Sequence, residues 1–198
     1  MPYDLFLALV AFALVMSMTP GPNNIMLTAS GVNFGFARSI PHMAGVQIGF
    51  MVVVAACAAG LGLLFASVPA LQLALKVAGA GYMLWLAWRV ANAKPASETG
   101  DLAAEPLTFF QAAAFQWVNP KGVLAALSGI ALFMRPGHAA TDFAILLAVF
   151  ALSTILSVVT WTGFGVALRQ LLQNPVHARI FNVAMALLLV ASIVPMVT

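Results

Sequence analysis

Two short polar segments interrupt apolar runs that are otherwise long enough to cross a bilayer, and both contain proline, glycine and amide side chains. Their residues are Thr19, Pro20, Gly21, Pro22, Asn23 and Asn24 in the first segment, and Asn119, Pro120, Lys121 and Gly122 in the second. Proline lacks an amide donor and restrains the residue before it, so a helix is predicted to stop near Met18 and to resume at Asn23. Broken backbone at membrane depth is tolerated only where protein buries it or where it lines a wet cavity. The first segment is therefore predicted to form a substrate or ion site, and the alternative is a proline kink that only shapes packing.

Lys121 lies in the middle of its apolar run, too far from either end to extend its ammonium easily into water. Such a lysine is rare and usually functional. Two roles are open for it, as the counter-charge of a substrate carboxylate or as the group that carries a coupled proton. The structural alternative is a cation that caps the carbonyls freed by Pro120. Gln116, about one turn before this break, is a further candidate for the cavity wall.

Other polar residues within the apolar runs are weaker candidates. Gln47 lies between Gly45 and Gly49, and that small-xxx-small pattern is typical of closely packed helices. His42 is expected to be an interfacial histidine at the cytoplasmic end of its span. The weaker candidates for the transport path share a hydroxyl group, and they are Ser153, Thr154, Ser157, Thr160 and Thr162.

No other chemistry can be assembled from the spacing. Cys57 is the single cysteine, which excludes an intrachain disulfide or a paired redox site, and it is expected to be a small core residue. No Cys, His, Asp and Glu cluster has metal-ligand spacing, and neither a phosphate loop nor a nucleophile with its base can be found. We therefore predict no catalytic residue, no metal, no cofactor and no enzyme activity. Redox and metal handling are disfavoured, whereas an intramembrane enzyme or a passive pore is harder to exclude.

The composition defines the class of protein. Hydrophobic residues make up 63% and charged residues 7% of the chain, and the mean hydropathy is +1.05, which excludes a soluble globular domain. The pI is about 9.5, yet the 8 lysines and arginines are scattered singly, mostly at the ends of apolar runs, so nucleic-acid binding is not expected. The chain is predicted to be a polytopic protein of the lipid bilayer.

Six apolar spans follow one another along the chain. They cover residues 5–33, 40–67, 70–91, 107–134, 142–168 and 178–197, each near or above the roughly 20 residues that a bilayer requires. Residues 93–106 form the only loop of soluble composition. We predict an all-α membrane protein with one integral domain, residues 1–198, built from a first repeat of about 1–92 and a second of about 107–198. Three spans in each half make these repeats inverted, and the broken helices 1 and 4 occupy corresponding places.

The basic residues predict the orientation. Arg38, Arg89, Lys94, Arg169 and Arg179 follow spans one, three and five, whereas Arg135 is the only one at a loop on the other side. The positive-inside rule then places loop 93–106 in the cytoplasm and both termini in the periplasm. Trp85 and Trp88 beside Arg89 are typical of an aromatic belt at the inner face.

The chain resembles the LysE/RhtB amino-acid exporters. The resemblance is carried by the first polar segment, by Gly79 to Trp88 in the third span, by Asn119 to Lys121 in the fourth, and by the length and span count of the whole chain. It is greatest to the branch that exports cysteine and O-acetylserine, followed by the homoserine and threonine exporters. The family implies a bacterial inner-membrane carrier that exports small amino acids at the expense of the proton gradient. Its conserved stretches fall on Thr19 to Asn24 and on Asn119 to Lys121.

The helix breaks and the family resemblance together predict one mechanism. The helix that starts near Asn23 would direct its free amides at a substrate carboxylate, and carbonyls freed by the prolines would meet the substrate ammonium. Rocking of one three-helix unit against the other would alternate access. Lys121 is the first choice for proton coupling, with His42, Asp4 or Asp142 as alternatives. The glycine-rich helix faces leave room for a homodimer.

Overall fold

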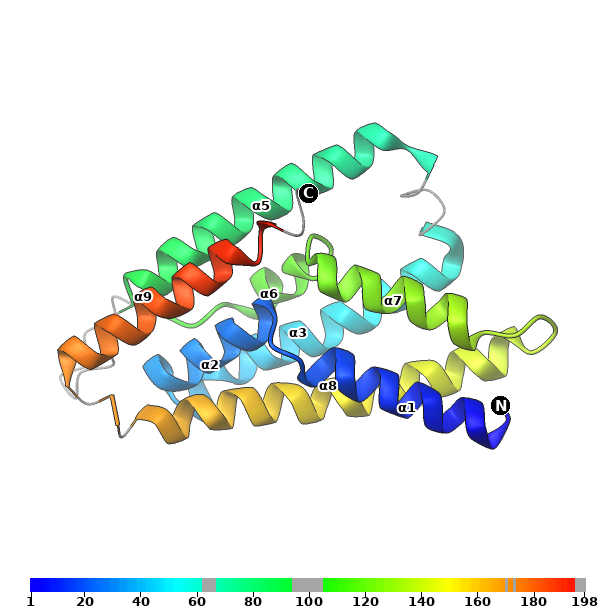
Figure 1. The fold of residues 1–198 in the computed structure, drawn as a ribbon, viewed down its shortest axis with the longest axis horizontal. Coiled ribbons are helices and arrows are strands. Elements are labelled where there is room, and N and C mark those ends of the chain that lie inside the picture. The colour runs from blue at the N-terminus through cyan, green and yellow to red at the C-terminus, as the bar shows by residue number, and fades with distance from the viewer. Residues whose placement is uncertain (62–66, 94–104, 170, 173, 195–198) are drawn as a thin grey trace.

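The computed structural model describes the whole chain except residues 62–66, 94–104, 170, 173 and 195–198. Within the described residues, all regular secondary structure is helical, which confirms the all-α prediction. Most helices run roughly along the longest axis of the molecule (Figure 1). The greater part of the predicted loop 93–106 lies outside the described residues.

The first span consists of two helices that meet at the predicted break. Helix α1 covers Tyr3–Met18 and helix α2 covers Pro22–Phe34, and the two are bent by 54°. Helix α2 begins one residue earlier than predicted, because proline is favoured at the first helical position, where an amide would have no partner within the helix. Gly21 between them has an extended backbone, with φ −165°. The break therefore follows from the prolines and the extended residue that joins them.

The predicted fourth span also contains two helices with a break between them. Helix α6 (Phe109–Phe115) starts with a capping box, in which Gln111 N donates to Thr108 Oγ1 over 3.3 Å and Thr108 N donates to Gln111 Oε1 over 3.1 Å. Helix α7 (Pro120–Phe133) restarts at Pro120. In Figure 1, α2 and α7 run from the two breaks in opposite directions. This direction is compatible with the predicted inverted repeat, which stays a prediction.

The remaining helices correspond to the other predicted spans. They are α3 (Phe36–Ala56), which continues into the π-helical turn η1 (Cys57–Leu61), then α5 (Pro69–Ala91), α8 (Ala139–Arg169) and α9 (Pro175–Ala191). By length and composition, two of the described helices can each cross a membrane, and the bent pair α1 and α2 counts as a third if it is one span. Leu73, Leu152 and Leu187 on three of these helices are 63%, 69% and 63% exposed, as residues in contact with lipid would be.

Several helix ends that carry arginine lie together at one end of the molecule. The ends of α2, α5 and α8 lie there with the starts of α3 and α9, at the left of Figure 1. By sequence, Arg38, Arg89, Arg169 and Arg179 belong to these helix ends. These four arginines therefore share one end of the fold, and the side of the membrane on which this end lies remains a prediction.

Glycines bring two helix pairs into backbone contact. A Cβ atom on Gly31 would overlap the carbonyl oxygen of Thr162, and one on Gly165 would overlap that of Thr28, so α2 and α8 touch where both residues lack side chains. Gly45 and Gly49 of α3 likewise meet the backbone of α6. The predicted packing role of Gly45 and Gly49 is confirmed.

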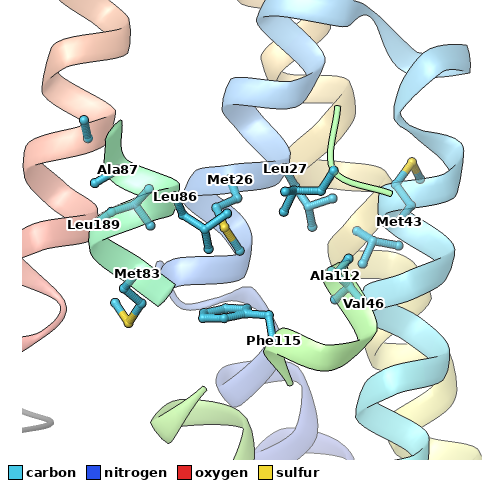
Figure 2. Close-up of a cluster of buried hydrophobic side chains, with 13 residues drawn as sticks. Met26, Leu27, Met43, Val46, Met83, Leu86, Ala87, Ala112, Phe115 and Leu189 are labelled. Carbon is cyan, nitrogen blue, oxygen red and sulfur yellow. The ribbon is translucent and has the colours of Figure 1, made fainter. Parts of the chain in front are cut away.

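Two apolar clusters hold the helices together. The first, which we call the inner cluster, joins α2, α3, α5, α6, α8 and α9, and Figure 2 shows Met26, Leu27, Met43, Val46 and Phe115 among its members. The second joins α1, α3, α7 and α8 and includes Cys57, which is 6% exposed. Cys57 is thus the core residue that the sequence predicted. The two helix breaks and the polar residues around them are positioned by these clusters.

Candidate functional site

A cavity of about 60 Å³ lies where the two helix breaks meet. It is lined by residues of α1, α2, α3, α7 and α8, together with the two connecting segments. The lining residues are Met16, Ser17, Gly21, Pro22, Asn23, Asn24, Val46, Phe50, Asn119, Lys121, Gly122, Ala125, Phe150, Thr154, Ser157 and Val158. We call it the central cavity.

Two helix N-termini contribute backbone donors to the central cavity. Neither α2 nor α7 has a side-chain hydrogen bond at its N-cap, which is Gly21 in one and Asn119 in the other. The first bond to each N-cap carbonyl comes from Ile25 N and from Val123 N, both over 3.0 Å. The amides of residues 23, 24, 121 and 122 therefore precede the helical ladder, and such N-terminal amides attract an anion. Both breaks thus present partial positive charge to the same space.

Lys121 connects the two breaks. Its Nζ donates to the carbonyl oxygen of Thr19. A Cβ atom on Gly21 would lie only 2.8 Å from Lys121 Cδ, so the absence of a side chain at Gly21 makes room for the lysine. The ammonium is half-buried beside the start of α2 and adds a full positive charge to the cavity.

The side chains of Asn24 and Ser157 donate hydrogen bonds to backbone carbonyls at the C-terminal end of α1. Asn24 Nδ2 donates to the carbonyls of Ser17 and Thr19 over 3.0 and 2.9 Å, and Ser157 Oγ donates to that of Ser17 over 2.7 Å. Asn24 is only 6% exposed. Protein side chains therefore already bind the carbonyls of Ser17 and Thr19, and the expectation that carbonyls freed by the prolines meet a substrate ammonium stays a prediction.

Gln116 and Asn23 form a reciprocal amide pair. Asn23 Nδ2 donates to Gln116 Oε1 over 2.8 Å, and Gln116 Nε2 donates to Asn23 Oδ1 over 3.1 Å and to the Ala112 carbonyl over 2.9 Å. Gln116 is fully buried and is not among the residues that line the cavity. It fixes Asn23, and with it the start of α2, against α6.

Asn119 offers an acceptor that no other described group uses. The residue is 3% exposed and lines the cavity, and its Oδ1 has no hydrogen-bond partner within the described part of the chain. A buried acceptor without a partner is uncommon, and in a cavity it is available to a ligand. An ammonium, hydroxyl or thiol of a bound molecule could donate to it.

Aromatic side chains form the apolar wall. The rings of Phe50 and Phe150 lie edge to face with centroids 5.4 Å apart, and Val46 and Ala125 also line the cavity. Sequence reasoning missed Phe50 and Phe150, because one phenylalanine in an apolar run gives no signal of its neighbours. Of the hydroxyl residues predicted as weaker candidates, Thr154 and Ser157 line the cavity.

The ten predicted site residues therefore divide into two groups. Gly21, Pro22, Asn23, Asn24, Asn119 and Lys121 line the central cavity. Thr19 and Pro20 are exposed at the first break, Pro120 starts α7, and Gln116 holds Asn23. These four residues shape the cavity without lining it.

An all-helical chain with an apolar outer surface and a polar cavity at two broken helices is typical of membrane transport proteins. Residues 14–194 match the model of the family described as LysE type translocator. The chain belongs to the LysE type translocator family.

Curated relatives support the same assignment. The chain is 35% identical over 181 residues to the cysteine/O-acetylserine efflux protein of Escherichia coli strain K12, which is 90% of each chain. The protein with the same name in Shigella flexneri also shares 35% over 181 residues and 90% of each chain, and that of Escherichia coli O1:K1 / APEC shares 34% over the same extent. No solved structure matches the chain significantly.

Proposed function

We propose that this translocator exports a small amino acid or a close derivative, which it binds as a zwitterion in the central cavity. The observation that carries the proposal is the convergence of two uncapped helix N-termini and the Lys121 ammonium on one small cavity. Such donors suit a carboxylate. Asn119 Oδ1 supplies the acceptor for the substrate ammonium.

The cavity wall supports a small side chain. Phe50 and Phe150 close the apolar side of a cavity of about 60 Å³, which disfavours large substrates. The relatives named as cysteine/O-acetylserine efflux proteins make those two compounds the first substrates to test.

We propose proton antiport as the energy source, with Lys121 as the coupling residue. A substrate carboxylate would compete with the Thr19 carbonyl for the Lys121 ammonium, so binding would loosen the contact between the two breaks. Asp142 is less suited, because Arg135 Nε and Nη2 bind its carboxylate over 2.8 and 2.9 Å. These hydrogen bonds raise the pKa of the Arg135 guanidinium.

Alternating access would follow from movement of one three-span unit against the other in the inner membrane. The opposite directions of α2 and α7 support this arrangement, and the basic helix ends support an orientation with that end in the cytoplasm. A homodimer is compatible with α5, where Leu73 and Val77 are 63% and 64% exposed and a Cβ on Gly81 would meet no atom within 4 Å.

The test is transport by the purified protein in liposomes. Vesicles loaded with unlabelled cysteine, O-acetylserine, homoserine or threonine are supplied with the labelled compound, with and without a pH gradient. We expect saturable exchange in loaded vesicles under both conditions, and net accumulation in vesicles without internal substrate only with the gradient. Flux that neither saturates nor responds to the gradient would establish a passive pore instead. Flux no greater than that of protein-free vesicles would contradict amino-acid transport.

A further inference from the structure

A second cavity, of about 200 Å³, lies at the basic end of the molecule. It is lined by residues of α2, α3 and α5, by the residues that follow α5 and by the segment before α6. Its polar lining includes Ser30, Asn33, His42, Arg89 and Asn92, and Leu86 and Leu107 are among its apolar residues. We call it the inner cavity. None of the residues predicted from the two helix breaks lines it.

His42 is the unusual member of this lining. The side chain is 1% exposed, and neither Nδ1 nor Nε2 has a hydrogen-bond partner among the described residues. A neutral imidazole has one donor and one acceptor, and leaving both without a partner in a buried place is unfavourable. A ligand in the inner cavity could satisfy them.

The polar neighbours of His42 already have partners. Ser30 Oγ and Ser39 Oγ are 2.8 Å apart, and Ser39 Oγ donates to the Gly35 carbonyl over 2.8 Å. Asn33 and Asn182 exchange amide hydrogen bonds of 2.9 and 3.1 Å. These pairs fix α2 against α3 and α9. The polar side chains around His42 therefore have hydrogen-bond partners within the protein. His42 differs from them, because neither of its ring nitrogens has a partner among the described residues.

Arg89 supplies a cation at the same cavity. Its guanidinium lies 5.1 Å from the centroid of the Trp85 ring, and Nη2 donates to the Glu105 carbonyl over 2.8 Å. A guanidinium has five N–H donors, and this bond uses one of them. The tryptophan and the carbonyl hold the arginine in place, and its geometry suits bidentate binding of a carboxylate.

The inner cavity lies in line with the central cavity along two shared helices. Helix α2 contributes Asn23 and Asn24 to the central cavity and Ser30 and Asn33 to the inner one, about 10 Å further along the helix. Helix α3 contributes Phe50 to the first and His42 to the second.

Part of the inner cluster lies on these shared helices between the two cavities. Met26 of α2 and Met43 and Val46 of α3 pack there, and Phe115 packs against the same cluster (Figure 2). Methionine side chains are flexible and adapt their shape readily, so Met26 and Met43 can rearrange around a small molecule.

We propose that the inner cavity is an entry site that binds an α-amino acid before it passes Met26 and Met43 to the central cavity. Arg89 binds the carboxylate of the amino acid, and the acceptor nitrogen of His42 receives a hydrogen bond from its ammonium. The proposal rests on the proposed function, because it assigns a second site for the same substrate class.

Equilibrium binding of labelled O-acetylserine to the purified full chain in detergent tests the proposal. We expect two equivalents per chain in the wild type. Arg89→Gln should weaken one of them about tenfold or more, as loss of a charge-assisted bond does, and His42→Phe should weaken the same one. Arg179→Gln is the matched control, because Arg179 is exposed at the same end of the molecule and lines neither the central nor the inner cavity. It should leave both equivalents unchanged.

The ligand itself provides a second test that needs no variant. The methyl ester of the amino acid lacks the carboxylate, so it should fail to displace the equivalent that depends on Arg89. Inorganic phosphate should also fail at equal concentration. Displacement by phosphate would identify a general anion site and overturn the proposal.

The outcomes separate this proposal from the function on which it rests. A single equivalent that is lost in Asn119→Ala and retained in Arg89→Gln would overturn the entry site and leave the central site intact. Absence of any amino-acid binding would overturn both. Gel-filtration profiles and Arg89→Lys, which keeps the charge, identify a variant that fails only because it misfolds.

Discussion

Lys121 Nζ donates a hydrogen bond to the carbonyl oxygen of Thr19, a residue 102 positions earlier in the chain. This contact joins the break in the first span to the break in the fourth. It also places the ammonium beside Gly21 and the free amides at the start of α2. One side chain therefore both holds the two breaks together and charges the cavity between them.

Replacement of Lys121 distinguishes its two possible roles. If the ammonium binds the substrate carboxylate, Lys121→Met should lose binding at every pH, and Lys121→Arg should recover little because its forked head does not fit the space beside Gly21. If the residue carries the coupled proton, the Lys121→Met variant should still exchange substrate in liposomes, but a pH gradient should not drive substrate accumulation. Lys76→Met, at an exposed position on α5, is the control. Normal gradient-driven export by Lys121→Met would leave the lysine a structural role only.

Gly21→Ala should impair transport through a steric effect alone. The backbone at Gly21 is extended, so alanine adds no strain there, but its Cβ would lie 2.8 Å from Lys121 Cδ. We expect the lysine to be displaced and the substrate affinity to fall by about tenfold, as loss of one charge-assisted bond would cause. Gly163→Ala is the matched control, since a Cβ there would meet no atom within 4 Å. Combining Gly21→Ala with Lys121→Met should add little to Lys121→Met alone, because both changes remove the same contact.

Asn119→Ala should raise the substrate concentration needed for half-maximal transport, by about tenfold, because it removes the acceptor assigned to the ammonium. Asn119→Asp keeps an acceptor at the same place and should bind more tightly than Asn119→Ala. Exchange kinetics in liposomes measure both. Equal kinetics for the wild type and Asn119→Ala would remove the acceptor role.

Pro20→Ala combined with Pro22→Ala should abolish transport while the protein still reaches the membrane. The double variant permits a continuous helix through the break, which withdraws the amides at the start of α2 from the cavity. Export assays normalised to membrane protein levels measure the effect. Near-normal export would mean that the prolines only shape packing.

Reporter fusions test the orientation. A reporter inserted in residues 93–106 should be active only if it functions in the cytoplasm, because the basic residues favour that side. A fusion at the N-terminus should show the opposite behaviour. A periplasm-active reporter in loop 93–106 would reverse the assignment, and with it the side from which the inner cavity is filled.

Local backbone chemistry made the helix breaks predictable. Pro20 and Pro22 restrict the backbone wherever they occur, so the end of α1 and the start of α2 could be predicted to within one residue, whereas Pro120 marked a second break without a predicted start for α7. The apolar composition and the length of the runs similarly predicted the class of protein. These properties depend only on residues that are close together along the chain, so they can be read from the sequence.

Contacts between segments far apart along the chain could not be predicted from the sequence. Gln116 was predicted to line the cavity, but it pairs with Asn23, 93 positions away. Phe50 and Phe150 look like any phenylalanine in a membrane span until packing brings them together. His42 was expected to be an ordinary interfacial histidine, and its missing partners are visible only once α2, α3 and α5 surround it. The positions of the helix breaks and the residues that are costly in a bilayer could thus be predicted from the chain, because both are local properties. Which of those residues meet was decided by tertiary packing, because side chains on helices far apart in the chain are brought together only by the fold.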